Sequence, residues 1–143
     1  MSGVHRFPLR VYFEDTDAGG IAYHARYLHW AERARTESLR DIGLPHSLLI
    51  ERHNSFLVVR RVNVLYERPA RLDQALVVET SVRKLGGVSI DLVQDVLDQE
   101  SGARLARLDV GLVCVRADGL RPTPIPEPWR SALRAGVSPG ALV

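Results

Sequence analysis

The stretch Arg10-Val-Tyr-Phe-Glu-Asp-Thr-Asp-Ala-Gly-Gly-Ile-Ala-Tyr-His-Ala-Arg-Tyr-Leu28 joins three local sequence patterns. Apolar and polar residues alternate over residues 9–14, which predicts a short strand. Acids and glycines follow over residues 15–20 and predict a loop. Apolar residues then recur at three- and four-residue spacing over residues 25–42 and predict a long helix, with Gly43 as its stop signal. A polar loop therefore lies between the end of a strand and the start of a helix.

After the predicted helix, the apolar residues no longer recur at three- and four-residue spacing, and the pattern becomes typical of strands. Four segments rich in Val, Leu and Ile predict strands, at residues 56–67, 76–85, 88–97 and 104–116. Gly86-Gly87 and Ser101-Gly102 predict turns, so we expect an antiparallel meander. The proline-bearing tail from Leu120 predicts an extended segment on the outside of the protein, with a short helix starting near Glu127.

The order of one strand, one long helix and four strands favours a two-layer α+β domain in which the sheet wraps around the helix. Trp30 and its apolar stripe would form the buried face of that helix. No linker or repeat divides the chain, so residues 1–143 are expected to form one domain. Because the sheet has two open edges, we expect a homodimer or a dimer of dimers.

Composition excludes several classes of protein. Cys114 is the only cysteine, which rules out an intrachain disulfide and a cysteine-based zinc site, and its apolar context predicts a buried thiol rather than a nucleophile. No apolar run approaches the roughly 18 residues of a membrane span, and the first ten residues carry no signal-peptide pattern, so we expect a cytoplasmic protein. The net charge of +2 comes from scattered arginines, and no nucleic-acid partner is expected.

The loop at residues 14–24 holds the densest cluster of titratable and flexible residues. A loop held between rigid elements is a common place for catalysis, and a helix N-terminus can polarise a carbonyl group. Asp17 and His24 could pair for acid–base chemistry, but spacing alone equally allows Asp17 to cap or turn the chain. Asp15, Asp17, His24 and His29 match no recognised metal-ligand spacing, so no metal is expected.

The same stretch, continued by Glu32-Arg-Ala-Arg-Thr-Glu37, resembles the signature of hotdog-fold acyl-CoA thioesterases, most closely the YbgC-like branch related to 4-hydroxybenzoyl-CoA thioesterase. Phe56-Leu-Val-Val-Arg-Arg61, Arg68-Pro-Ala-Arg-Leu-Asp73 and the tail from Pro122 to Trp129 are also similar to that family. The resemblance implies a five-stranded antiparallel sheet wrapped around a long central helix. It also implies dimers with active sites at the subunit interface.

Carried over by position, the resemblance places the catalytic aspartate on Asp17 and a histidine at the helix entrance on His24. It implies that the backbone N–H of His24 receives the thioester oxygen, and that Asp15 is structural. Asp17 would act as a nucleophile or as a general base, two roles that the sequence leaves open. Phe13 stands where some YbgC-like enzymes have a tyrosine, and Tyr12 is expected on the opposite strand face.

The resemblance implies hydrolysis of short- to medium-chain or small aromatic acyl-CoA to free acid and coenzyme A, without a cofactor. Candidate substrate-binding residues are Tyr23, Arg60, Arg83 and Lys84. A dehydratase of the same fold is disfavoured because the acid lies in the loop rather than on the long helix. The alternative of another class is a binding module for acyl-carrier protein or an envelope complex, with little or no hydrolase activity.

Overall fold

The long helix forms where the apolar period predicts it. The structure is a computed structural model, which describes residues 3–136. Helix α1 (Arg26–Asp41) confirms the prediction for residues 25–42 to within one residue at each end. It buries Tyr27, Trp30, Ala31, Ala34 and Leu39, which lie on one face because of the 3.6-residue turn. Gly43, with φ of 77°, adopts the left-handed conformation that ends the helix.

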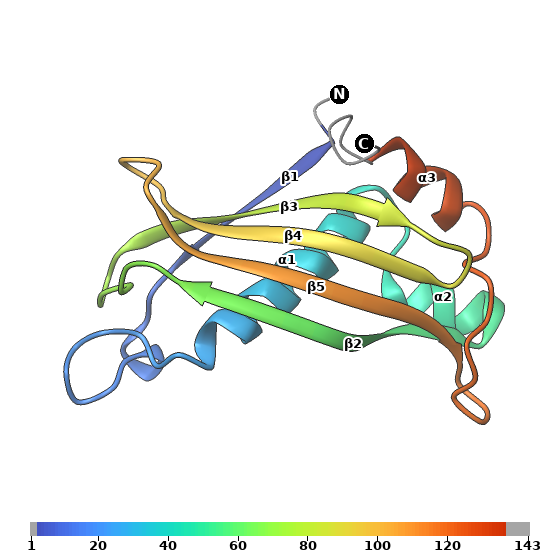
Figure 1. Cartoon of the computed structure of the whole chain (residues 1–143), viewed down its shortest axis with the longest axis horizontal. Coiled ribbons are helices and arrows are strands. Elements are labelled where there is room, and N and C mark those ends of the chain that lie inside the picture. Colours follow the sequence, from blue (N-terminus) through green and yellow to red (C-terminus); the bar gives the residue numbers. More distant parts are fainter. Residues whose placement is uncertain (1–2, 137–143) are drawn as a thin grey trace.

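A five-stranded antiparallel sheet covers one side of α1 (Figure 1). Its strands are β1 (Val4–Arg10), β2 (Ser55–Tyr66), β3 (Ala75–Leu85), β4 (Ser89–Asp98) and β5 (Arg104–Arg116). The four predicted strand segments are confirmed with small shifts in their bounds. The sheet around α1 confirms the α+β architecture, and its inner face supplies much of the core, including Leu76, Val78, Leu108 and Val110.

The strand order is β1-β3-β4-β5-β2, so the expected meander is correct only for β3, β4 and β5. Strand β2 pairs with β5, not with β3, and lies at an edge of the sheet. The physical reason is the connection of residues 67–74, which is too long for a tight hairpin and forms hydrogen bonds with another loop. Its Ala70 accepts a hydrogen bond from the backbone N–H of Ala22 at 2.8 Å. That contact draws the connection away from the β2 edge.

The first strand ends earlier than the alternation of residues 9–14 predicts, and the prediction is wrong there. Strand β1 stops at Arg10, and Phe13–Asp15 form a 3₁₀ turn, η1. The Asp15 carboxylate accepts a hydrogen bond from the backbone N–H of Tyr12 at 2.8 Å, which stabilises the turn against extended structure. Tyr12 and Phe13 therefore do not occupy opposite faces of a strand, and both are exposed.

The C-terminal tail runs over the surface as expected, since most of residues 120–128 are exposed, but two of its side chains are anchored in the core. Helix α3 (Trp129–Ala135) begins close to the predicted position, but Trp129 and Ile125 are buried in the core. The indole N–H of Trp129 donates to the carbonyl of Leu44 at 3.0 Å, which ties the tail to the segment after α1. Another helix, α2 (His46–His53), follows that segment and is not anticipated by the sequence analysis.

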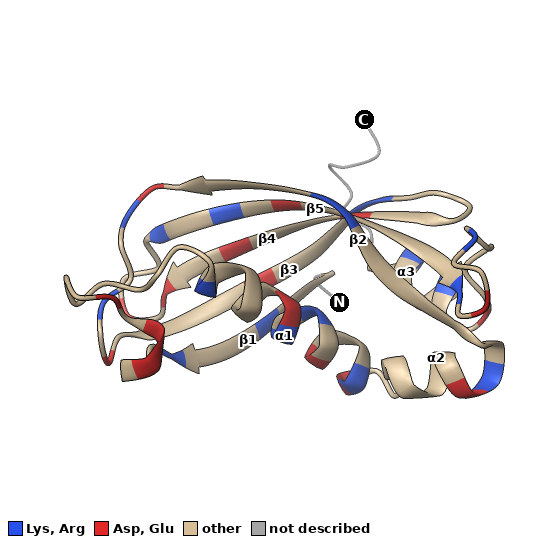
Figure 2. Cartoon of the chain, turned by 90° about the horizontal axis from the view of Figure 1, so that it is seen from below, with Lys and Arg blue, Asp and Glu red and all other residues tan. Residues whose placement is uncertain are grey.

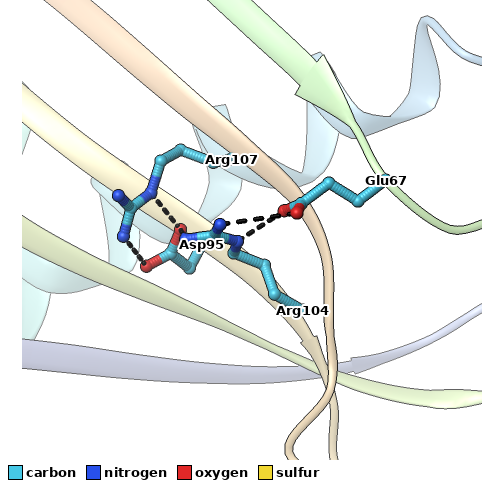
Figure 3. A network of polar contacts seen from close by, with 4 residues as sticks. All are labelled: Glu67, Asp95, Arg104 and Arg107. Atoms are coloured by element: carbon cyan, nitrogen blue, oxygen red, sulfur yellow. Dashed lines mark hydrogen bonds and ion pairs between the residues drawn. The ribbon is translucent and has the colours of Figure 1, made fainter.

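Charged side chains cross-link the outer part of the sheet. Arg107 of β5 binds the Asp95 carboxylate of β4 through two N–H groups at 2.8 and 3.0 Å, and Arg104 pairs with Glu67 (Figure 3). Lys, Arg, Asp and Glu are interspersed along the helices and strands in Figure 2. No helix among the described residues is long and apolar enough to cross a membrane.

Candidate active site

Asp17 lies at the tip of a short, hydrogen-bonded loop. Residues Thr16 and Ala22 form an antiparallel bridge, and the backbone N–H of Asp17 donates to the carbonyl of Ile21 at 2.9 Å. Gly20 closes the turn with φ of 78°, a conformation that favours glycine. The Asp17 side chain is exposed, and its Oδ1 accepts the N–H of Gly19 at 2.8 Å. The loop therefore holds a carboxylate in a defined place facing solvent.

Asp15, two residues earlier, has a different environment. Asp15 is only 7% exposed, and its carboxylate accepts the Tyr12 N–H. Its Oδ1 lies 3.6 Å from Nε of Arg26. The carbonyl of Asp15 also accepts the N–H of Tyr23 at 2.8 Å. Asp15 thus ties η1 to the start of α1, which is the structural role that the resemblance implies.

A second loop holds the Asp17 loop in position. The Ala70 N–H donates to the hydroxyl of buried Tyr27 at 3.0 Å, and Ile21 forms a bridge with Arg71. The Tyr27 ring packs edge-on against Tyr66, with ring centroids 5.1 Å apart. The first turn of α1, the end of β2 and both loops therefore form one connected unit.

His24 is exposed at the entrance of α1, as predicted. Its carbonyl accepts the hydroxyl of Tyr66 at 2.7 Å, and its ring lies against Tyr23 with centroids 4.4 Å apart. Within residues 3–136 the His24 backbone N–H donates no hydrogen bond, and no hydrogen bond joins His24 to Asp17. The expected pairing of imidazole and carboxylate is not formed, whereas an N–H at the helix start is open to a ligand.

The other candidate substrate residues are spread over the chain. Tyr23 is half exposed beside His24. Arg60 is exposed on the edge strand β2, where the β2–β5 pairing has a bulge between Val59 and Arg61. Arg83 and Lys84 are exposed near the end of β3, and the register places that end of the sheet away from the Asp17 loop. The structure therefore brings only Tyr23 together with His24 within one chain.

The structure also places the candidate nucleophile and the candidate metal ligands that the sequence contains. Cys114 is buried, and its burial raises the pKa of the thiol, which disfavours the nucleophilic thiolate. In the part of the chain that the structure describes, no three His, Cys, Asp or Glu side chains are grouped as metal ligands would be.

Sequence reasoning missed a cavity of about 520 Å³ at the other end of α1. Arg35 and His46 line it, and both are partly buried. Burial lowers the pKa of His46, an effect that Glu32 partly opposes. The sequence gives no signal for this role of Arg35, because no local pattern shows that a helical Arg faces a cavity built by distant strands.

Comparison with known proteins identifies the family. The model of the thioesterase-like superfamily matches residues 11–133, so the chain belongs to that superfamily and is a thioester hydrolase. Within it the chain belongs to the YbgC-like acyl-CoA thioesterases. It is similar to acyl-CoA thioesterase YbgC of Haemophilus influenzae, with 40% identity over 126 residues that span 88% of this chain and 91% of the relative.

Solved structures confirm the hotdog fold. A probable thioesterase from Bartonella henselae is 36% identical, with a TM-score of 0.80 over 86% of this chain and 99% of that one. A gentisyl-coenzyme A thioesterase is 27% identical, with a TM-score of 0.78 over 85% of this chain and 96% of that one. The α+β sheet wrapped around α1 is thus the hotdog fold that the sequence predicts.

Proposed function

We propose that the protein hydrolyses short- to medium-chain or small aromatic acyl-CoA thioesters to free acid and coenzyme A, with Asp17 as the catalytic carboxylate. The observation that carries the proposal is the immobilised, solvent-facing carboxylate of Asp17 on the loop that leads to the open N–H of His24. The names of the relatives support the reaction, and the gentisyl-coenzyme A thioesterase supports the aromatic part of the substrate class.

In the proposed reaction the thioester carbonyl oxygen accepts the N–H of His24. That N–H and the positive end of the α1 dipole stabilise the negative charge that develops on the oxygen. Asp17 either attacks the carbonyl carbon, forming an anhydride that water then hydrolyses, or removes a proton from the attacking water. In both routes a C–O bond forms, the C–S bond breaks, and a proton reaches the departing thiolate.

His24 is proposed to assist through its imidazole as well as its backbone. The ring makes no hydrogen bond within the described residues, so both nitrogens are available to a substrate or a water molecule. Imidazole is a common general acid in enzymes and suits the protonation of a leaving thiolate. The neighbouring Tyr23 ring offers an apolar and hydrogen-bonding surface for the substrate.

The proposal includes a homodimer, or a dimer of dimers, because the site is uncovered in one chain. Val59 and Val62 lie on the inner face of edge strand β2 and are 50% and 38% exposed, and Leu28 of α1 is 38% exposed. Two copies joined antiparallel through β2 would cover these side chains. In that arrangement the Arg83 and Lys84 end of one sheet lies at the Asp17 end of the other, which supports their proposed contact with coenzyme A phosphates.

A cytoplasmic location accompanies the proposal, since the single cysteine, Cys114, is buried and has no disulfide partner in the sequence. The carrier of the acyl group is proposed to be coenzyme A. Acyl-carrier protein presents the same pantetheine thioester and is therefore the competing carrier.

The test is thiol release from hexanoyl-, decanoyl-, palmitoyl- and benzoyl-CoA by wild type, Asp17→Asn and Glu14→Gln. Glu14 is a matched control because it is an exposed carboxylate of the same segment. Wild type and Glu14→Gln should turn over the shorter aliphatic or aromatic esters, and Asp17→Asn should lose roughly 10²-fold or more of the rate. No turnover of any CoA ester by folded wild type contradicts the proposal, and acyl-carrier-protein esters then test the binding-module alternative.

A further inference from the structure

The cavity of about 520 Å³ lies between the second half of α1, α2, α3 and the inner face of the sheet. In Figure 1, α2 and α3 lie at the same end of the molecule, and α1 runs behind the middle of the sheet toward them. Much of the wall is apolar and includes Leu39, Val82, Leu112 and Leu133. None of residues 11–31 lines the cavity, so it is separate from the Asp17 loop within the chain. Its volume is typical of small-molecule sites.

Among the described residues one cation, Arg35, lines this apolar space, and the carboxylate that also lines it, Glu32, forms no ion pair with it. Arg35 donates from Nη1 to Oε1 of Gln94 at 3.0 Å, but no carboxylate within residues 3–136 forms an ion pair with it. A guanidinium carries five N–H donors, so most of them remain available. Burial lowers the pKa of Arg35, which shows that the charged form is poorly solvated there.

Gln94 fixes the position of this guanidinium. Gln94 is fully buried, and its amide nitrogen donates to the carbonyl of Ala31 at 2.9 Å and to the hydroxyl of Thr80 at 3.0 Å. Both amide hydrogens are therefore used, and the amide oxygen is oriented toward Arg35. The cation is held by a hydrogen-bonded network and is pre-organised for a further acceptor.

The other charged and polar groups at the cavity limit the ligand's charge. Glu32 raises the pKa of Arg35, but Glu32 is exposed and screened by solvent. Burial lowers the pKa of His46, which disfavours its charged form and so disfavours a second cation in the cavity. His5 binds Asp41 through Nε2 at 2.6 Å, while its buried Nδ1 has no hydrogen-bond partner within the described residues. The cavity thus offers one partly buried cation, Arg35, and one exposed acid, Glu32. This charge balance matches a ligand with one negative charge better than a phosphate dianion.

We propose that the cavity binds a monocarboxylate with an apolar body, whose carboxylate oxygens accept hydrogen bonds from Arg35. The guanidinium fork matches a carboxylate, and the apolar wall takes the aliphatic or aromatic part of the acid. The acid set free by thioester hydrolysis is of this chemical class, so the cavity provides a site for product in addition to the Asp17 loop. Binding itself does not require turnover.

The experiment is calorimetric titration of the full chain with octanoate and, as an uncharged match of the same length, with octan-1-ol. Octanoate should bind wild type at least about ten-fold more tightly than octan-1-ol does, since hydrogen bonds to charged groups have that magnitude. Arg35→Met should weaken octanoate binding at least about ten-fold while changing octan-1-ol binding less than about three-fold. Arg35→Lys keeps the positive charge but loses the forked geometry of the guanidinium. Its affinity for octanoate should therefore lie between those of wild type and Arg35→Met.

Two further variants locate the binding site. Ala132 is half-buried on α3 and lines the cavity, so Ala132→Phe should fill the space and weaken the binding of both ligands. Asp17→Asn should leave octanoate binding within about two-fold. The proposal is overturned if octanoate shows no saturable binding to wild type, if folded Arg35→Met binds it as wild type does, or if Asp17→Asn rather than Ala132→Phe removes it. A failure of the thioesterase proposal alone would change turnover and leave this titration unaffected.

Discussion

Asp15 and Asp17 are two residues apart, yet the structure predicts opposite effects when each is replaced by Asn. The Asp15 carboxylate is buried and accepts the Tyr12 N–H, with Arg26 at 3.6 Å. A hydrogen bond to a charged group contributes about 1.5–3 kcal/mol and a neutral one about 0.5–1.5 kcal/mol, so Asp15→Asn loses about 1 kcal/mol there. The weakened, partly exposed pair with Arg26 adds about 0.5 kcal/mol. Asp15→Asn should therefore destabilise the protein by about 1.5 kcal/mol.

Asp17→Asn should change the free energy of unfolding by less than about 0.5 kcal/mol, because Asp17 is exposed and Asn can still accept the Gly19 N–H. Urea unfolding followed by tryptophan fluorescence measures both effects, since Trp30 and Trp129 are buried at 2% and 1% exposure. All proteins are compared at one concentration, because assembly raises apparent stability. The melting temperature of Asp15→Asn should fall by about 5 °C.

Turnover supplies the other half of this prediction. Asp15→Asn, measured at a temperature where it is folded, should keep at least about a tenth of the wild-type rate, whereas Asp17→Asn should not. The reasoning is refuted if Asp15→Asn is as stable as wild type and inactive. It is equally refuted if Asp17→Asn, rather than Asp15→Asn, lowers the free energy of unfolding by about 1.5 kcal/mol.

Three further predictions concern the support of the site and the sheet. Tyr27→Phe leaves the N–H of fully buried Ala70 without its acceptor and should lower the free energy of unfolding by about 1–3 kcal/mol, measured by urea unfolding. An unchanged free energy would contradict the supporting role of the hydrogen bond between Tyr27 and Ala70. Burial lowers the pKa of His46 below 6.5, so the unfolded chain takes up this proton first and stability falls as the pH drops below about 6.5. His46→Gln should therefore lose less stability than wild type between pH 7.5 and 5.5, and equal losses would contradict this assignment. Asp95→Asn removes the paired acceptor of Arg107 and should destabilise by about 1 kcal/mol or less, an effect that shrinks in 1 M salt because the pair is partly exposed; a salt-independent loss would point to packing instead.

The local spacing of apolar residues in the sequence was sufficient to predict most helices and strands of the fold. The spacing of Tyr27, Trp30, Ala31 and Ala34 determines which face of α1 is buried, and this is a property of neighbouring residues. The Gly86-Gly87 turn joins β3 to β4 for the same local reason. The place of β2 next to β5 depends instead on backbone pairing that runs from Ser55↔Arg116 to Tyr66↔Ala106, between residues far apart in the chain.

The candidate site shows the same division between local and distant information. The position of Asp17 in a loop and of His24 at the helix entrance follow from local signals. The proposal that Asp17 rather than Asp15 is catalytic rests on the resemblance to the family motif. The buried state of Asp15 is not visible in spacing, because it requires Arg26 and the turn at Tyr12 to converge. The cavity beside Arg35 is similarly assembled from helices and strands across the whole chain.

The anchoring of the tail by Trp129 is the clearest case in which local patterns gave no information. The prolines before Trp129 predict extended chain correctly, but they give no information on which surface the chain covers. Trp129 is buried because its indole reaches the carbonyl of Leu44 and its ring packs edge-on against His53, with centroids 5.6 Å apart. A large aromatic residue in a tail is therefore better evidence of docking than the prolines are of exposure.

The most direct test of the central claim is the turnover number of Asp17→Asn on the best acyl-CoA substrate of the wild type, with equal folded fractions verified by urea unfolding. If Asp17 is the catalytic carboxylate, kcat should fall by roughly 10²–10⁴-fold while the free energy of unfolding stays within about 0.5 kcal/mol of wild type. A folded Asp17→Asn protein that hydrolyses this substrate within about three-fold of the wild-type rate would contradict the account.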